Sequence, residues 1–157
     1  MMTIGSILNE LRETFSPANW TVYSTQRLKT IRIAVCDDYS LYRRALSMVL
    51  GRIQGFEVVL QAANGQQLLD QISSARPDVV LLDLDMPVMD GAATADILLR
   101  TYPNIEIILL TLGRENVDVS DLLKKGIQVF VSKDADPDEI EMAIRKGELR
   151  KQYWRKR

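Results

Sequence analysis

Strand-like and helix-like segments alternate five times between residues 31 and 147, and this alternation constrains the fold more than any other feature of the sequence. The expected strands are short apolar segments at residues 31–36, 56–60, 78–83, 105–111 and 127–132. The expected helices lie at residues 40–50, 65–74, 92–102 and 116–125 and from residue 137 onward. Strands that alternate with helices predict a parallel sheet with helices on both faces, so the sequence indicates an α/β fold.

Local signals support these segments and predict which side chains face the core. The strand expected at residues 78–83, DVVLLD, is almost continuously apolar, as is typical of a parallel strand that is buried on both faces. Gly126 is expected to end the fourth helix, and Pro137 is expected in the first turn of the fifth. The first helix is expected to turn one apolar stripe inward, which comprises Leu41, Ala45, Leu46, Val49 and Leu50.

The two ends of the chain differ from this regular part. Residues 1–30 lack the alternation and are interpreted as an N-terminal extension, either flexible or a short partner-binding or dimerising helix capped by Ser6 and ended by Pro17. Residues 148–157 are interpreted as a basic C-terminal tail. Residues 145–157 hold seven Lys or Arg and one Glu, which gives a net charge of +6. The tail is expected to be a linker or a solvated helix end, with contact to nucleic acid phosphates as the alternative.

The residue types that are missing exclude several classes of function. The chain has no histidine, which excludes Ser-His-Asp and Cys-His catalysis, and its single cysteine, Cys36, excludes an intramolecular disulfide and a thiolate zinc site. No apolar run exceeds four residues, so no segment is expected to span a membrane. Glu10 and Glu13 stand where a signal peptide would be uncharged, and a cytoplasmic location is therefore expected.

Polar side chains follow several of the expected strands, at the positions where these strands end. They are Asp37, Asp38, Asp83, Asp85, Thr111 and Lys133. In a parallel sheet these ends lie at one edge, where open α/β sheets place their functional sites. Carboxylates that crowd together repel one another unless a cation neutralises them, and oxygen ligands without imidazole or thiolate favour a hard cation. The sequence therefore predicts a Mg²⁺ site at this edge.

These residues stand in motifs that resemble the receiver domains of two-component response regulators. The strongest segment is PDVVLLDLDMPVMDG at residues 77–91, in which an aspartate precedes Met-Pro and Asp-Gly. The acidic pair of IAVCDD (33–38), the threonine of ILLTLG (108–113) and the lysine of FVSKD (130–134) occur in matching order and spacing. The resemblance covers residues 31–147 and implies a flavodoxin-like (βα)5 fold, a doubly wound parallel sheet of five strands in the order 2-1-3-4-5.

The resemblance implies a chemical role for each acidic residue. Asp83 would accept a phosphoryl group from a phosphohistidine on a sensor histidine kinase or a phosphotransfer protein. Asp38 would bind Mg²⁺ directly and Asp37 largely through water. Asp83 and the backbone carbonyl of Asp85 would complete the protein's share of the metal site.

The remaining implied roles belong to a conformational switch. Thr111 would hydrogen-bond the phosphoryl oxygens, Lys133 would form an ion pair with them, and Phe130 would turn inward when Thr111 moves. The chain would thus be a signalling switch rather than an enzyme, with homodimerisation through the fourth and fifth strands as an expected output. Leu112 is bulkier than the residue that many receivers have after this threonine, so slow loss of the phosphoryl group is expected.

Two functions from other classes are weighed against this interpretation. A pseudo-receiver would use the same fold to bind a partner without phosphorylation or Mg²⁺. The segment DLD at 83–85 also matches the Asp-x-Asp motif of haloacid-dehalogenase-type phosphatases, but Pro87 stands where that motif has Thr or Val. Asp134 after Lys133 resembles LuxR/NarL-type regulators, whose receivers are joined to helix-turn-helix DNA-binding domains. The sequence shows no such domain, so we expect a stand-alone receiver or a piece of a longer regulator, without DNA binding by this chain alone.

Overall fold

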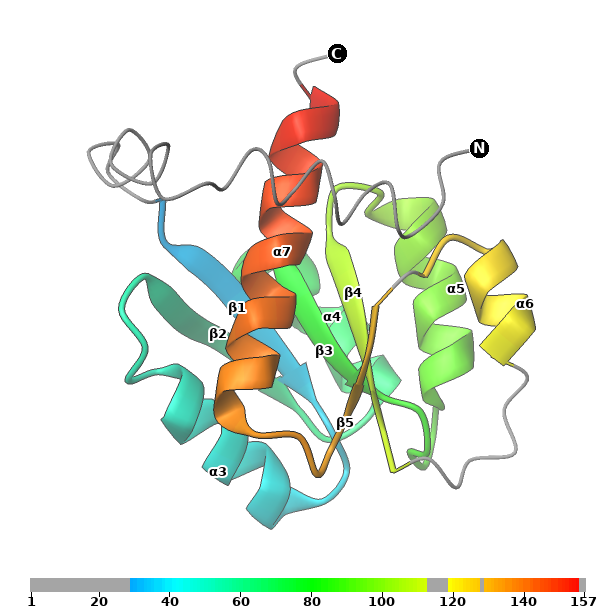
Figure 1. The fold of residues 1–157 in the computed structure, drawn as a ribbon. Helices are drawn as coiled ribbons and strands as arrows, with labels where there is room; N and C mark the ends of the chain where they lie inside the picture. Colours follow the sequence, from blue (N-terminus) through cyan, green and yellow to red (C-terminus); the bar gives the residue numbers. More distant parts are fainter. Residues whose placement is uncertain (1–28, 113–118, 128, 156–157) are drawn as a thin grey trace.

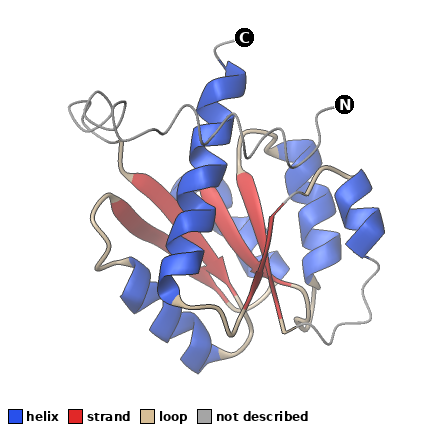
Figure 2. Ribbon diagram, viewed as in Figure 1, coloured by secondary structure: helices blue, strands red, loops and turns tan. Residues whose placement is uncertain are grey.

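The computed structural model describes residues 29–112, 119–127 and 129–155, which form a five-stranded sheet covered by helices (Figure 1, Figure 2). The strands are β1 (Ile31–Cys36), β2 (Phe56–Ala62), β3 (Val79–Asp83), β4 (Glu106–Thr111) and β5 (Val129–Ser132). The helices are α3 (Ser40–Leu50), α4 (Gly65–Ala75), α5 (Gly91–Thr101), α6 (Val119–Lys124) and α7 (Pro137–Arg155).

The strands pair in parallel in the order β2-β1-β3-β4-β5, which confirms the predicted sheet. The chain moves outward from β1 to β2 and then returns past β1 to β3. The order therefore reverses between β1 and β3, whose carboxyl ends are adjacent because Cys36 pairs with Leu82. Open α/β sheets bind their ligands at such a reversal. The fold thus places the residues that follow β1 and β3 at the expected position of a functional site.

Apolar side chains fill the space on both faces of the sheet. Helices α3 and α7 cover one face, and α4, α5 and α6 cover the other (Figure 1). Within β4, Ile108 and Leu110 face the first layer, whereas Ile107 and Leu109 face the second. Every residue of β3 is buried, as its continuous apolar run predicts. The strands that carry the site are therefore held in the middle of the molecule.

The predicted inward stripe of α3 is wrong in part. Leu46 and Leu50 are buried, but Leu41, Ala45 and Val49 are exposed. The helix is rotated so that Tyr42, Arg43 and Ser47 turn toward the sheet. The reason is polar, since Arg43 binds the end of β1 and Ser47 Oγ donates to the Arg43 carbonyl at 2.7 Å. The spacing of apolar residues in the sequence gives no information about these polar contacts, so it could not predict the rotation of the helix.

The element ends differ from the prediction by a few residues. Strand β5 begins at Val129 rather than at residue 127, and α6 is described from Val119, so its expected start at residue 116 lies outside the described residues. Gly126 ends α6 as predicted: its φ is 105°, in the left-handed region, and its N–H donates to the Leu123 carbonyl at 3.1 Å. The short helix expected near Ser6 also lies outside the described residues.

Helix α7 continues past residue 147, where the basic tail was expected to begin. Arg150 forms an ion pair with Glu106 at the start of β4, and Lys151 Nζ contacts the Asp78 carbonyl just before β3. This part of α7 therefore packs at the end of the sheet opposite to the carboxyl ends of the strands. None of the described helices, α7 included, combines the length and the apolar character that crossing a membrane requires.

Candidate functional site

Asp37 and Asp38 follow β1 directly, and hydrogen bonds of Asp37 with β2 and α3 hold the pair in place. The Asp37 N–H donates to the Ala62 carbonyl at 3.0 Å, and the Asp37 carbonyl accepts from Arg43 Nη1 at 2.5 Å. Asp37 Oδ1 accepts a hydrogen bond from the Tyr39 N–H at 2.8 Å, where the chain turns into α3. The Asp37 side chain is fully buried and Asp38 is exposed. The acidic pair therefore supplies one buried and one accessible carboxylate.

Asp83 is the last residue of β3 and is 2% exposed. The loop that follows Asp83 folds back onto the end of β3, where the Gly91 N–H donates to the Leu84 carbonyl at 2.9 Å. A Cβ on Gly91 would overlap the backbone carbonyl of Asp83, so this approach requires glycine. Asp90 caps α5 by accepting from the Ala93 N–H at 2.8 Å. The start of α5 thus fixes the position of Asp83.

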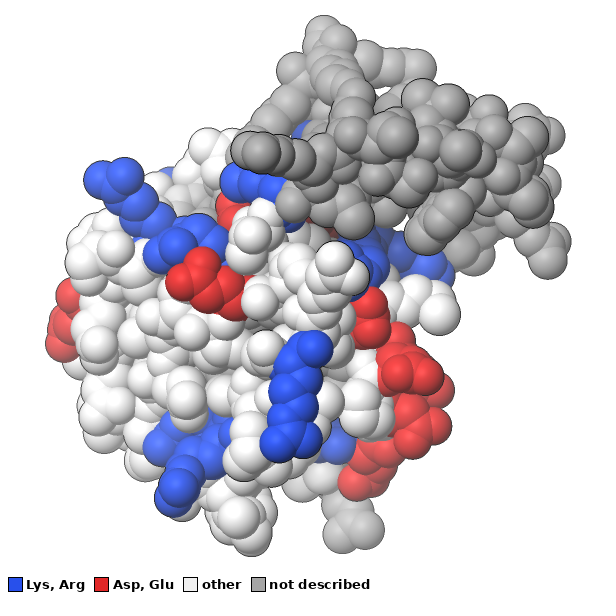
Figure 3. All heavy atoms as spheres, turned by 90° about the vertical axis from the view of Figure 1, so that its left-hand side faces the viewer, with Lys and Arg blue, Asp and Glu red and all other residues white. Residues whose placement is uncertain are grey.

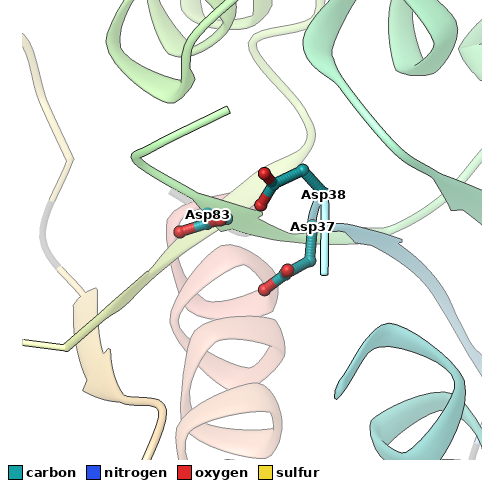
Figure 4. A group of neighbouring side chains, drawn as sticks. All are labelled: Asp37, Asp38 and Asp83. Carbon is teal, nitrogen blue, oxygen red and sulfur yellow. The ribbon is translucent and has the colours of Figure 1, made fainter. Parts of the chain in front are cut away.

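The three carboxylates converge beyond the strand ends (Figure 4). One oxygen from each of Asp37, Asp38 and Asp83 lies within 4.8 Å of the others. Asp37 Oδ2 is buried and accepts no hydrogen bond within the described part of the chain. Its charge is balanced by a cation instead, since Lys133 Nζ lies 2.7 Å away. Three oxygen ligands, one of them open to water, fit a Mg²⁺ ion that retains part of its hydration shell.

Lys133 places a positive charge between two of these carboxylates. Its Nζ lies 2.7 Å from Asp37 Oδ2 and 3.0 Å from Asp83 Oδ1, and its side chain is 11% exposed. Both contacts are ion pairs, so a single ammonium group balances the charge of two carboxylates. The Lys133 N–H donates to the Thr111 carbonyl at 2.8 Å, which joins the ends of β4 and β5.

The charges in the site shift the pKa values of two groups. The pKa of Asp83 is raised to about 6: burial is the main cause, the Asp37 charge adds to it, and the hydrogen bond from Lys133 opposes it. Burial by itself would lower the pKa of Lys133, but the bonds to Asp37 and Asp83 outweigh burial and raise it. Above pH 7 the site therefore holds an ionised Asp83 next to a charged ammonium group.

The other predicted residues lie around this centre. Thr111 is half-buried at the end of β4, and Leu112 after it is 52% exposed. Phe130 is half-buried and packs against the core layer beneath α4, α5 and α6. The Asp85 side chain is exposed and lies outside the group of three carboxylates, and its backbone N–H lowers the pKa of Asp83. The structure thus brings Asp37, Asp38, Asp83 and Lys133 together.

Two residues of the site were missed from the sequence. Arg43 holds the backbone of Asp37, and Lys133 Nζ lies over the ring of Tyr42. Both belong to the first turn of the helix that follows the acidic pair. This position in the sequence could have identified them, because the first turn of a helix that follows a strand directly lies beside the end of that strand.

Cys36 lies next to the site but does not contribute a reactive group. Burial raises the pKa of its thiol to about 12, and the charge of Asp37 adds to this effect. Its Sγ lies 3.6 Å from Met86 Sδ in the core. The thiol therefore packs as a small apolar group.

Comparison with known proteins agrees with this geometry. The sequence profile of the family described as "Response regulator receiver domain" matches residues 33–145. The response regulator GacA of Pseudomonas viridiflava is 36% identical over 115 residues, which cover 73% of this chain and 54% of that protein. The nitrate/nitrite response regulator protein NarP of Escherichia coli is 35% identical over 116 residues, covering 74% and 54%. The chain thus spans about half the length of these curated relatives.

Solved structures share the fold over most of the described residues. A NarL signal receiver domain from Mycobacterium tuberculosis superposes with a TM-score of 0.64 at 32% identity, and the match covers 77% of this chain and 94% of that one. The response regulator domain of Thermotoga maritima CheB gives a TM-score of 0.68 at 22% identity, with coverage of 76% and 96%. At that identity the second likeness concerns the fold alone.

Proposed function

This chain belongs to the family of response regulator receiver domains, and we propose that it is a switch that accepts a phosphoryl group on Asp83. The donor is the phosphohistidine of a sensor histidine kinase or a phosphotransfer protein in the cytoplasm, and the reaction requires Mg²⁺. The domain catalyses only its own phosphorylation and dephosphorylation. The output of any longer regulator is outside this proposal, because the chain spans about half of its curated relatives.

The observation that carries the proposal is the position of Asp83. Its buried carboxylate lies 3.0 Å from Lys133 Nζ and within 4.8 Å of carboxylate oxygens of Asp37 and Asp38. An oxygen of Asp83 forms the new bond to phosphorus, while the bond from phosphorus to the donor's histidine nitrogen breaks and its electron pair stays on that nitrogen. Lys133 can form an ion pair with the phosphoryl oxygens as they arrive.

Mg²⁺ is the cofactor that the carboxylate cluster supports. Asp37, Asp38 and Asp83 would hold it together with the backbone carbonyl of Asp85. When bound, the ion neutralises the charge between these carboxylates and the phosphoryl oxygens. The protein's part is orientation, since Arg43 holds the backbone of Asp37.

The same contacts support a conformational response. A phosphoryl group on Asp83 adds negative charge at the sheet edge, which attracts Lys133 and the Thr111 hydroxyl. The backbones of these two residues are joined by a hydrogen bond of 2.8 Å, so the ends of β4 and β5 respond together. Phe130 lies in β5 close to Lys133 and is half-buried. We propose that its ring changes its packing when the ends of β4 and β5 respond to the phosphoryl group.

DNA binding by this domain is not part of the proposal. On the face of the molecule drawn in Figure 3, Lys and Arg side chains are interspersed with Asp, Glu and uncharged residues. Phosphate backbones favour continuous basic patches. Arg150 and Lys151 of the basic segment are engaged by Glu106 and Asp78 instead.

Intact mass spectrometry after incubation with acetyl phosphate tests the proposed function. We expect wild-type protein to gain the mass of one phosphoryl group when Mg²⁺ is present and none when Mg²⁺ is chelated. The Asp83→Asn variant is expected to gain none under either condition. Absence of an adduct, under conditions that label a known receiver, would exclude phosphorylation and favour a binding module of the same fold.

Magnesium is expected to stabilise the protein through Asp38. Saturating Mg²⁺ should raise the melting temperature of the wild type by about 4 °C, because only the folded chain presents the site. Asp38→Asn removes the exposed ligand and should lose most of this shift. The control is Asp70→Asn, an exposed residue of α4 outside the cluster, which should keep the full shift. Equal shifts in all three proteins would contradict a shared metal site.

Leu112 is expected to slow the loss of the phosphoryl group. It is 52% exposed directly after Thr111, where its side chain can hinder the approach of water to the acyl phosphate. Leu112→Ala should shorten the phosphoryl lifetime about threefold, measured by the decay of the mass adduct. Leu123→Ala, at a leucine of α6 that is 51% exposed, is the matched control. An unchanged lifetime in Leu112→Ala would refute the shielding role.

A further inference from the structure

An aromatic ring from α3 lies against the ammonium group of Lys133. The centroid of the Tyr42 ring is 5.3 Å from Lys133 Nζ, within the range of a cation–π contact. Tyr42 is half-buried and packs against the core on the side of α3 and α7. Its ring adds a third partner for Lys133, whose ionic partners are the carboxylates of Asp37 and Asp83.

The hydroxyl group of Tyr42 does not explain this placement. It is buried and has no hydrogen-bond partner among the described residues, which is unfavourable for a polar group. Burial raises the pKa of the phenol above its ordinary value and outweighs the opposing charge of Lys133, so the group is neutral at pH 7. The favourable contact of Tyr42 with the site is therefore made by the face of its ring.

The ring differs from the carboxylate partners in one respect that matters for the reaction. Asp37 and Asp83 compensate the charge of Lys133 as long as no metal or phosphoryl group engages them. A cation that engages both carboxylates would weaken their attraction for Lys133 before the phosphoryl oxygens arrive. The Tyr42 ring remains neutral and unmodified throughout, so its contact with the ammonium group persists.

We propose that Tyr42 is a positioning residue, whose ring face holds the Lys133 ammonium group in place while the carboxylates exchange their partners. This inference rests on the proposed function. The Lys133 side chain beside this ring is 11% exposed, and low exposure to water strengthens the attraction between Lys133 and the arriving phosphoryl oxygens. Tyr42 thereby affects the rate of phosphorylation without touching the reacting atoms.

The rate of phosphorylation by acetyl phosphate at saturating Mg²⁺ tests the proposal. Tyr42→Leu should lower the rate constant about tenfold, and Tyr42→Phe, which keeps the ring, should restore it to within about twofold of the wild type. Affinity for Mg²⁺ should be unchanged in both variants, which a loosely folded site would not allow. In a Lys133→Ala background, Tyr42→Leu should cause no additional loss, because the two residues act through one contact.

The contact itself is measured separately in the metal-free protein. Aromatic rings shift the resonances of protons that lie over their faces, so the Lys133 side-chain protons should move upfield in the wild type and in Tyr42→Phe. The shift should be absent in Tyr42→Leu. Phe56→Leu is the matched control, since Arg145 lies 4.6 Å from the Phe56 ring centroid in a second cation–π pair. Tyr42→Met replaces the leucine variant if that variant does not fold.

The outcomes separate this inference from the function on which it rests. A wild type that takes up no phosphoryl group overturns the proposed function, and the inference with it. If the wild type is phosphorylated and Tyr42→Leu is phosphorylated at the same rate, only the inference about Tyr42 is overturned. A rate for Tyr42→Phe as low as that of Tyr42→Leu also overturns it, because the hydroxyl would then be the active group.

Discussion

Asp83→Asn is expected to stabilise the metal-free protein by about 2 kcal/mol at about pH 8. Asp83 is 2% exposed, and burial is the main reason why its pKa lies at about 6 rather than at the ordinary value of 3.8. Above that pKa the folded protein holds a buried charge, which water would solvate better in the unfolded chain. An amide of the same shape carries no charge and relieves this cost.

The pH dependence of this effect follows from the direction of the shift. Because the folded-state pKa lies above the unfolded one, the contribution of Asp83 to stability is fully present below pH 3.8 and is lost as the pH rises through about 6. The advantage of Asn should therefore be largest above pH 6 and should vanish near pH 4.

Urea unfolding of the wild type and of Asp83→Asn across this pH range, with EDTA present, measures the effect. Asp70→Asn, at an exposed site, should change the free energy of unfolding by less than about 0.5 kcal/mol at each pH. A gain in Asp83→Asn that increases as the pH falls would contradict the assigned cause. Added Mg²⁺ should reduce the gain, because it stabilises the wild-type carboxylates.

Arg150→Met is expected to destabilise the protein by about 2 kcal/mol near neutral pH. Its partner Glu106 is 8% exposed at the start of β4, so removal of Arg150 leaves a buried carboxylate that is attracted by Lys151 and repelled by Glu148. Helix α7 approaches closely at this point, since a Cβ on Gly147 would lie 2.8 Å from Glu106 Cγ. Close packing leaves the structure little means of solvating the charge.

The loss in Arg150→Met should increase with pH and should be rescued by a second substitution. Burial raises the pKa of Glu106, while Arg150 and Lys151 lower it. Without Arg150 the folded-state pKa rises further, so the destabilisation should grow as Glu106 ionises. Glu106→Gln/Arg150→Met should be more stable than Arg150→Met near neutral pH. Thermal unfolding, with the exposed Lys146→Met as control, tests both points. A loss of equal size at every pH would show that packing rather than charge is responsible.

The sequence determined the alternation of elements and the approximate position of the site. Strand and helix are specified by local patterns, such as the apolar run of β3 and the left-handed Gly126 at the end of α6. Asp38 and Asp83 could be assigned to one edge because the ends of parallel strands meet there whatever their packing. The similarity to receiver domains then supplied the chemical roles of these residues, which could not be predicted from composition or periodicity.

Only the tertiary structure decided which side chains meet. The orientation of α3 about its axis reflects the contacts of Arg43 with the Asp37 carbonyl and of Tyr42 with Lys133, in addition to the two buried leucines of its apolar stripe. Likewise, the pairing of Arg150 with Glu106 adds to the buried Ile140 and Ile144 in holding α7 to the sheet, and a basic run by itself does not reveal that pairing. The physical reason is common to both cases. Local periodicity is a property of neighbouring residues, whereas a buried charge is stable only next to a partner that the fold brings from a distant part of the chain.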